Sequence, residues 1–529
     1  MLFTSYNFIL FLLALFIIYY IIPQKYQWLL LLVASFFFYS CSGWDNVAYI
    51  TVTITATYFT AVKIGQLHRQ QELYLKENKG SLSKEEKKAY KDKVKSKQKK
   101  YLLLCLFFDL GVLAVVKYTN FAISNINSVS KIFNAGELSF LDIALPMGIS
   151  FYTFQSVGYL VDVYRGKYAP EKNIGKFALF VSFFPQLIQG PISRFDDLGY
   201  QLYSGHSFDF RNVSFGIQRI LWGFFKKLVI ADRILPAVKT ITQNPDTYQG
   251  IYVLIGMVFY AIQLYADFTG GIDITIGIAE VLGIKLKENF ERPFFSKSTA
   301  EYWRRWHITM GTWFRDYVFY PVSVSNAMLK ISKFSREKFG ENTGKRVPVY
   351  LSTIIVWFAT GIWHGASWNF IVWGLLNCLV IIVSQELEPF YVWFHNRFNV
   401  RDKFMFKLFQ VGRTFLLMSA IRILDCYRNV RVTFRMYGSM VTKWNIGELF
   451  NGALLKLGID KADYFVLLFG IIIMIVISLA QRNGSIREKL SARPDVIRYA
   501  AYVGLFISII VFGAYGVGYD RNQFIYNQF

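Results

Sequence analysis

Long uninterrupted apolar stretches recur along this chain of 529 residues and constrain its fold more than any other feature. Residues 6–22, 101–116, 464–480 and 500–518 each approach the ~20 apolar residues that a helix needs to cross a bilayer core. Charged residues make up only 18% of the chain, below the roughly 25% of an average soluble domain. We therefore expect an all-α polytopic membrane protein.

Four regions follow from the spacing of these stretches. Residues 1–64 are expected to hold three spans, because the first stretch lacks the basic flank and cleavage site of a signal peptide. Residues 65–100 are the most charged segment and are expected to form a basic cytoplasmic loop, which places the N-terminus outside the cell membrane. A core at residues 101–384 and further spans at residues 385–529 bring the total to about 11–13 transmembrane or re-entrant segments.

Charge and cysteine content exclude several classes of function. The formal net charge of +23 comes from basic residues in short loops between spans, where positive-inside retention and anionic lipid account for it. Nucleic-acid binding is therefore not expected. The four cysteines are far apart and show neither metal-ligand spacing nor a disulfide framework, so no metal site is predicted.

The middle of the chain carries proline and glycine inside its apolar stretches. Pro146 and Gly148 lie within residues 145–163, and Pro185 lies within residues 177–194. Broken helices at membrane depth are tolerated only where they are buried in protein or line a cavity. This region is expected to form the walls of a chamber.

One of five histidines, His364, lies in an apolar segment far from either polar end. An ionisable ring at that depth is costly and marks a functional site by default. On a continuous helix, several polar and small residues share its face: Trp357, Thr360, Gly361, Ser367 and Trp368. Gly361 and Gly365 form a small-residue pair that admits a helix or ligand close to the backbone.

A second histidine, His307, lies in the motif Tyr302-Trp-Arg-Arg-Trp-His307. The motif is also typical of an interfacial aromatic belt with arginines that reach the lipid headgroups. A buried pair of imidazoles suits one ring as general base and the other as hydrogen-bond partner to a developing charge. The remaining histidines, His68, His206 and His395, are expected to be surface residues.

Two aspartates, Asp267 and Asp273, are the other deep ionisable groups. They suit a cation or proton site of a transporter or lipid flippase. They equally suit a structural role, paired with a helix terminus or with an arginine such as Arg304 or Arg305. The structural role is favoured, since the inverted repeats common in transporters are not apparent.

Several motifs together resemble the membrane-bound O-acyltransferase superfamily, in particular its bacterial alginate O-acetylation branch. They are Pro191-Ile-Ser-Arg194, Tyr265-Ala-Asp-Phe-Thr-Gly-Gly-Ile-Asp273, Asn289-Phe-Glu-Arg-Pro-Phe294, Tyr302-Trp-Arg-Arg-Trp-His307 through Trp313-Phe-Arg-Asp316, Gly361-Ile-Trp-His-Gly365 and the end Gln523-Phe-Ile-Tyr-Asn-Gln-Phe529. The resemblance implies a helical chamber in which His364 is the catalytic histidine and His307 occupies the family's second polar catalytic position.

The resemblance also implies the substrates and partners of the reaction. An acetyl group would pass from cytoplasmic acetyl-CoA, with no permanently bound cofactor, to an extracytoplasmic polysaccharide through a separate SGNH-type partner protein. A basic face suits the phosphates of the donor, and its residues are expected to include Lys226, Lys227, Arg304 and Arg305. The chamber is expected to be lined by Asp267, Trp303, Trp306, Trp363 and Asn369.

Three alternatives remain open from the sequence. The D-alanyl transfer protein of teichoic acid modification is a relative that takes its acyl group from a carrier-protein thioester. The length of chain after His364 favours the alginate-like branch over it. A transporter or flippase that uses Asp267 and Asp273 is the second alternative, and a scaffold for a polysaccharide synthesis complex is the third.

Overall fold

The computed structural model describes residues 3–515 of the chain, and these fall into two compact units. Unit 1 takes residues 3–214 and Ile278–Leu286, and unit 2 takes Phe215–Gly277 and residues 287–515. Among the described residues, regular secondary structure is helical, with one isolated bridge between Phe290 and Trp306. This confirms the all-α class. The C-terminal motif that ends at Phe529 lies outside the described residues.

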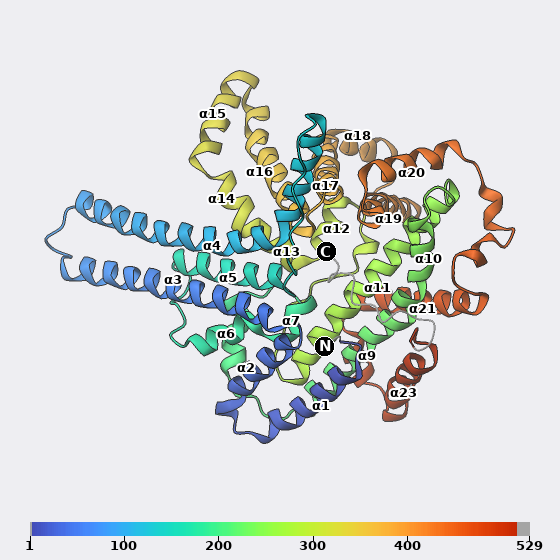
Figure 1. Ribbon diagram of the computed structural model, residues 1–529, viewed down its shortest axis with the longest axis horizontal. Helices are drawn as coiled ribbons and strands as arrows, with labels where there is room; N and C mark the ends of the chain where they lie inside the picture. Colours follow the sequence, from blue (N-terminus) through green and yellow to red (C-terminus); the bar gives the residue numbers. More distant parts are fainter. Residues whose placement is uncertain (1–2, 516–529) are drawn as a thin grey trace. The chain divides into compact units, whose positions relative to one another are not determined.

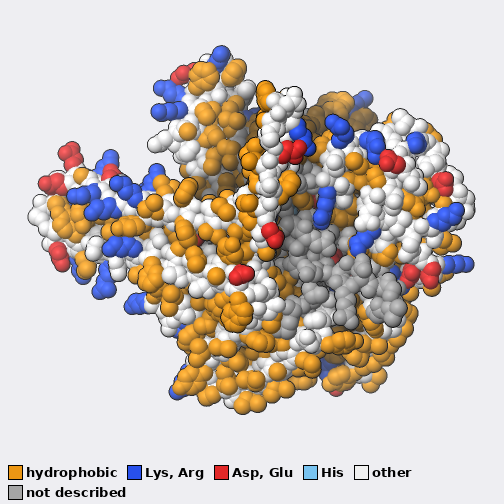
Figure 2. Space-filling view, viewed as in Figure 1, with side chains coloured by type: hydrophobic (Ala, Val, Ile, Leu, Met, Phe, Trp, Pro, Cys, Tyr) orange, Lys and Arg blue, Asp and Glu red, His pale blue; other side chains and the backbone are white. Residues whose placement is uncertain are grey.

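Unit 1 is built from eight helices. They are α1 (Tyr6–Ile21), α2 (Gln24–Ser40), α3 (Trp44–Glu77), α4 (Lys84–Ile132), α5 (Ile149–Tyr164), α6 (Ile174–Ser182), α7 (Phe184–Gln189) and α8 (Phe195–Tyr203). The three stretches expected to span the membrane at the start of the chain lie in α1, α2 and the first half of α3, and of these helices α3 is long and apolar enough to cross a membrane. Apolar side chains gather over α1 and α2 (Figure 2).

The basic segment at residues 65–100 is helical apart from a short turn at residues 78–83. It forms the adjoining ends of α3 and α4, which lie side by side as a long hairpin (Figure 1). Ser83 and Glu86 form a capping box that starts α4 directly after a short turn. Because α4 then continues to Ile132, the expected span at residues 101–116 is the middle of one helix of 49 residues.

The interruptions predicted in the middle of the chain are present. Pro146 and Gly148 precede α5, and Phe183 separates α6 from α7. Gly148 has a φ of 72°, and a Cβ added there would lie 2.3 Å from the Leu187 carbonyl oxygen. Only glycine tolerates both that conformation and that approach. The broken helices α6 and α7 are buried against α5 by contacts such as the 2.8 Å hydrogen bond from Gln155 to Gln186.

Unit 2 holds the remaining elements. They are α9 (Phe210–Phe224, which begins in unit 1), the π-helix η1 (Phe225–Ala231), α10 (Asp232–Gln243), α11 (Ile251–Val281, which ends in unit 1), η2 (Pro293–Phe295), α12 (Thr299–Arg305), α13 (Ile308–Phe314), the π-helix η3 (Arg315–Phe319), α14 (Tyr320–Ser323), α15 (Asn326–Phe339), α16 (Glu341–His364), α17 (Trp368–Glu386), α18 (Glu388–Phe398), α19 (Phe404–Tyr427), α20 (Val430–Thr442), η4 (Ile446–Leu449), η5 (Ala453–Lys456), α21 (Lys461–Ala480), η6 (Gln481–Asn483), α22 (Ile486–Ser491) and α23 (Asp495–Phe512).

Eight segments of the described chain are long and apolar enough to cross a membrane, which makes the protein an integral membrane protein. They lie at α3, α4, α11, α16, α17, α19, Lys461–Asn483 and α23. Shorter apolar helices occur at Tyr6–Ile21 and Ile174–Gln189. The long stretch after Ile251 is one continuous helix of 31 residues, and the apolar stretch around His364 is the pair α16 and α17.

Candidate active site

His364 is the last residue of α16. Gly365 leaves the helix with extended backbone, and the ring of Phe370 lies 2.2 Å from where a Cβ on Gly365 would be. The helix ends here, and any larger residue at position 365 would clash with that ring. This break corrects one expectation: Ser367 and Trp368 belong to the start of α17 and do not share the helical face of His364.

Close backbone contact joins α16 to α17. A Cβ on Gly361 would lie 2.6 Å from the Phe370 carbonyl oxygen, and one on Gly374 would lie 2.4 Å from the Trp357 carbonyl oxygen. Glycines at both positions let the two helices approach more closely than ordinary side chains permit. The approach that the small-residue pair predicted is therefore made by a neighbouring helix, and it sets His364 beside the first turns of α17.

His307 lies between α12 and α13 and has the left-handed conformation, with a φ of 49°. Asn289 holds this turn: its carbonyl accepts from the Ile308 N–H at 3.0 Å, and its Oδ1 accepts from the N–H and hydroxyl of Thr309 at 3.0 and 2.9 Å. A non-glycine residue in this conformation is strained and persists only where its surroundings fix it. The motif that begins at Asn289 thus positions the motif that ends at His307.

Trp363 lies between the two imidazoles. Its ring centroid is 5.9 Å from that of His307 and 4.9 Å from that of His364. Both histidines are buried, with exposed fractions of 1% and 7%. His364 also makes a T-shaped contact with Trp373, at 4.7 Å between ring centroids. The structure therefore brings the two predicted histidines into one aromatic cluster.

Arg422 and Asp425 on α19 complete this cluster. Neither residue was predicted from the sequence. Both are buried, and Arg422 Nη1 donates to Asp425 Oδ2 at 3.0 Å. The guanidinium lies over three indole rings, those of Trp373, Trp306 and Trp303, at 4.8, 5.1 and 5.6 Å. The sequence could have revealed this pair, because Arg422 and Asp425 are opposite charges three residues apart inside an apolar stretch. Ionisable groups inside spans are rare and mark functional sites.

A small cavity of about 10 Å³ joins these groups and has room for about one water molecule. Its lining is aromatic and apolar except for one imidazole and one ion pair: Leu264, Phe268, Trp306, His364, Phe370, Arg422 and Asp425. Within the described part of the chain, Arg422 Nε and Nη2 and Asp425 Oδ1 are buried without a hydrogen-bond partner. Such atoms are costly to bury, so they mark where a polar ligand atom fits.

His307 is neutral under physiological conditions. It lies outside the candidate spans, and burial, helped by the positive charge of Arg422, lowers the pKa of His307 to about 3. A neutral imidazole has one N–H donor and one acceptor nitrogen. His307 is therefore suited to hydrogen bonding at the site, while its position 5.1 Å from Phe268 places it beside the cavity wall.

The predicted lining residues divide between the cavity and its support. Trp306 lines the cavity, and Trp363 separates the histidines. Trp303 packs under Arg422 and donates to Asn377 at 3.2 Å. Asn369 donates to the Leu424 carbonyl at 3.1 Å, which ties the start of α17 to α19 near Asp425.

Asp267, also predicted to line the chamber, is directed elsewhere. Lys227 in η1 donates to its carboxylate at 2.6 Å and also contacts Asp232 at 2.8 Å. Asp273 likewise forms salt bridges with Lys226 at 2.6 Å and with Arg219 at 3.0 Å. Arg304 and Arg305, the partners expected from the sequence, are not the partners found in the structure. Both aspartates are therefore paired with cations, as the structural alternative expected, but the cations are Lys227 for Asp267 and Lys226 with Arg219 for Asp273.

The same ion pairs correct the predicted basic face. Lys226 and Lys227 are buried, because the π-helix η1 turns both ammonium groups toward α11. They therefore do not present free charge to a donor. Arg304 is exposed, and Arg305 pairs with Glu301 at 2.7 Å one turn earlier in α12. Donor binding by these two arginines stays a prediction.

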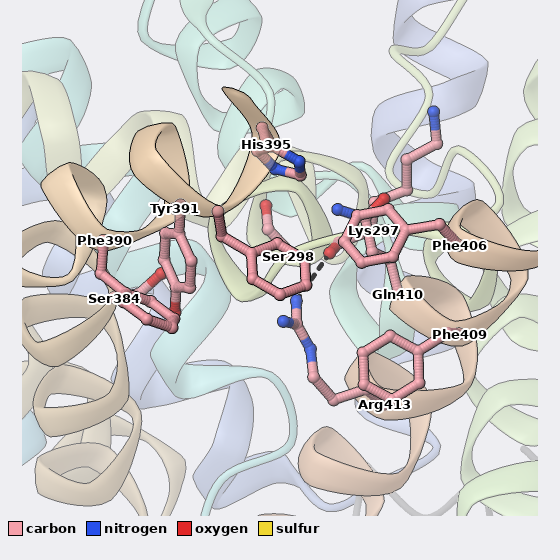
Figure 3. A pocket seen from close by; sticks show the side chains of 11 residues that line it. Lys297, Ser298, Ser384, Phe390, Tyr391, His395, Phe406, Phe409, Gln410 and Arg413 are labelled. Carbon is pink, nitrogen blue, oxygen red and sulfur yellow. Dashed lines mark hydrogen bonds between the residues drawn. The ribbon is translucent and has the colours of Figure 1, made fainter. Parts of the chain in front are cut away.

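A second, larger pocket of about 300 Å³ lies where α17, α18 and α19 meet the segment before α12 (Figure 3). Eleven residues line it: Lys297, Ser298, Ser384, Phe390, Tyr391, Phe394, His395, Phe406, Phe409, Gln410 and Arg413. His395 was expected to be a solvated surface residue, but its ring packs against Phe406 at 5.3 Å. The aromatic residues that recur along α18 and α19 were the sequence feature that pointed to this pocket.

Comparison with known proteins identifies the family of this chain. The model of the membrane-bound O-acyltransferase family, MBOAT, matches residues 52–428, which include both histidines and the Arg422–Asp425 pair. The chain belongs to this family of membrane acyltransferases.

Individual relatives refine the comparison. The chain is 32% identical to "Probable alginate O-acetylase AlgI" of Pseudomonas syringae pv. tomato, over 85% of this chain and 77% of the relative. It is 30% identical to the peptidoglycan O-acetyltransferase of Helicobacter pylori, over 68% and 64% of the two chains. It is 28% identical to the teichoic acid D-alanyltransferase of Bacillus subtilis, over 46% and 59%.

Proposed function

We propose that this protein takes an acetyl group from acetyl-CoA on the cytoplasmic side of the bacterial cell membrane and passes it outward for O-acetylation of a cell-surface polysaccharide. The observation that carries the proposal is one cavity bordered by His364, Arg422 and Asp425, with His307 on the far side of Trp363. The names of the two relatives that are 32% and 30% identical to this chain support acetyl as the group and polysaccharide as the final acceptor.

His364 is assigned the role of general base. An acceptor hydroxyl attacks the carbonyl carbon of the thioester, its proton passes to His364, and a carbon–oxygen bond forms. The carbonyl electron pair moves onto oxygen. Collapse of this intermediate reforms the carbonyl and breaks the carbon–sulfur bond, and the departing thiolate takes the proton from His364. Imidazole suits both transfers because it accepts and returns a proton near neutral pH.

Arg422 is assigned to stabilise the negative oxygen of that intermediate. Arg422 lines the cavity, and its Nε and Nη2 have no hydrogen-bond partner among the described residues. Asp425 and three indole rings fix the position of its guanidinium group. A fixed cation in a water-poor site acts strongly on charge that develops during the reaction. His307, neutral and buried, is assigned to assist by hydrogen bonding.

The donor and the topology complete the proposal. Acetyl-CoA approaches from a basic cytoplasmic face that includes Arg304 and Arg305, whose guanidinium groups suit phosphates. The N-terminus is placed outside the cell by the positive-inside rule. An extracytoplasmic SGNH-type partner completes transfer to the polymer. The small cavity requires that this region open when the thioester enters, as in other enzymes with gated sites.

D-alanyl transfer is the competing function, and one experiment separates the two. Purified protein is incubated in parallel with labelled acetyl-CoA and with labelled D-alanyl carrier protein, each with wild type and with His364→Ala. We expect cleavage of acetyl-CoA alone, dependent on His364. Cleavage of the D-alanyl thioester alone would establish the alternative, and equal cleavage of acetyl-CoA by both proteins would remove His364 from the mechanism.

Transport through Asp267 and Asp273 is not supported by their surroundings. Each carboxylate is already balanced by a buried ammonium group at 2.6 Å. A coupling ion would have to displace a buried ammonium group from each carboxylate, which is costly because buried charges depend on their partners.

A further inference from the structure

The larger pocket lies at the boundary between membrane and water. The candidate span α17 ends beside the pocket, and the candidate span α19 begins beside it. The short helix α18 joins these two spans. Large apolar side chains are exposed around it, among them Trp393 and Phe398 on α18 and Phe404 on α19. Aromatic residues gather in this way at the level of lipid headgroups.

Charge places this boundary at the cytoplasmic leaflet. Glu386 at the end of α17 contacts Arg346 at 2.9 Å, so the pocket lies at the same end of the helix pair as the start of α16. That end is rich in basic residues: Lys330, Lys333, Arg336, Lys338, Lys345, Arg346, Arg397, Arg401 and Lys403. Basic segments at span ends are retained on the cytoplasmic side.

The pocket itself combines aromatic walls with positive charge. Its walls include rings from Phe390, Phe394, Phe406 and Phe409, and its cations are Lys297 and Arg413 (Figure 3). No Asp or Glu stands among the described residues that line it. The lining therefore complements a molecule with an anionic group and an apolar body.

Arg413 and His395 bring polar nitrogen atoms to the pocket lining. Arg413 Nη2 donates to the carbonyl oxygen of Lys297 at 3.0 Å, which fixes the guanidinium beside the start of α12. His395 Nδ1 is buried without a hydrogen-bond partner in the described part of the chain. Arginine and lysine at this depth bind lipid phosphate, and apolar rings bind the chain beneath it.

We propose that this pocket is a binding site for one anionic phospholipid of the cytoplasmic leaflet. The phosphate contacts Lys297 and Arg413, and an acyl chain lies along the exposed rings of Phe390 and Phe409. A water-soluble ligand is disfavoured, because half-exposed phenylalanines at the rim belong in lipid and not in water. The proposal does not depend on the catalytic roles assigned above.

Lipid binding to the purified full-length protein tests this proposal. Native mass spectrometry and the lipid-induced rise in melting temperature are measured with phosphatidylglycerol, phosphatidylcholine, inorganic phosphate and acetyl-CoA as separate probes. We expect one tightly bound phosphatidylglycerol, at least about tenfold weaker binding of phosphatidylcholine, and no stabilisation by phosphate alone. Equal binding of the two lipids, or displacement of phosphatidylglycerol by acetyl-CoA, would overturn the proposal.

Variants localise the site. Lys297→Gln with Arg413→Gln should weaken phosphatidylglycerol binding at least about tenfold, whereas Arg401→Gln with Lys403→Gln, outside the lining, should leave it unchanged. Gln410→Glu adds a negative charge to the pocket without changing side-chain size, so it should weaken the same binding even if the double variant folds poorly. Wild-type affinity in Gln410→Glu would overturn the assignment to this pocket.

Discussion

The guanidinium of Arg422 lies 4.8 Å from the ring centroid of Trp373, the same indole whose ring contacts His364 at 4.7 Å. An arginine side chain keeps its charge in a protein, and aromatic faces stabilise a cation that has lost its water. The indole thus holds a permanent positive charge next to the imidazole without neutralising it. This arrangement underlies the first two predictions.

His364→Ala should reduce acetyl transfer by about 10²–10⁴-fold, the usual contribution of general acid–base catalysis. Insertion and melting temperature should change little, since His364 closes a small cavity and does not hold the helix pair together. Thioester cleavage by purified protein is the measurement. His68→Ala, a histidine of unit 1 that contacts the Tyr164 carbonyl, is the matched control and should keep full activity.

Arg422→Lys should lower the rate of thioester cleavage about 10²–10³-fold with little change in KM for the donor, because the cation acts on charge that appears only in the transition state. Lysine preserves the charge but lacks the planar fork that reaches both the cavity and Asp425. Arg435→Lys, an exposed arginine paired with Asp246, is the control. A rise in KM at constant kcat would instead assign Arg422 to donor binding.

His307 should make stability depend on pH. In the unfolded chain its pKa is about 6.5, and burial with the charge of Arg422 lowers the pKa of His307 to about 3 in the folded protein. Below pH 6.5 the unfolded state therefore binds more protons, so folding stability falls as pH falls toward 3. Melting temperature between pH 7.5 and 5.5 should drop more for wild type than for His307→Gln, which cannot titrate. Parallel slopes would contradict the buried neutral state.

Asp267→Asn should destabilise the protein without a transport phenotype. Lys227 would keep only Asp232 as a carboxylate partner, and a buried charge that loses one of two partners lowers the melting temperature, here by at least about 5 °C. Lys227→Met combined with Asp267→Leu and Asp232→Asn should recover part of the loss, because apolar side chains replace buried ion pairs well and no carboxylate is then left without its lysine. No recovery in the triple variant would point to a function for the charges beyond structure.

The sequence alone determined the class of fold and the two histidines. Apolar length sets which segments enter the membrane, and this depends only on local composition, so the all-α membrane class was predictable. The rarity of an ionisable ring in hydrocarbon singled out His364 for the same reason. Gly361 and Gly365 also predicted that a neighbour would pack closely against the backbone of this segment. They did not indicate which neighbour that would be.

Only the tertiary structure decided which charged side chains and which helices contact one another. The sequence left the partner of Asp267 open between a helix terminus and an arginine such as Arg304 or Arg305. In the structure the partner is Lys227 of the π-helix η1, and π-helices have no clear mark in composition. The helices of the basic segment at residues 65–100 form a hairpin because α3 and α4 pack against each other, and composition does not reveal that packing. Arg422 and Asp425 reach His364 from α19, some 60 residues along the chain from His364. Contacts between residues so distant in sequence depend on how helices pack, and periodicity within one segment carries no information about that.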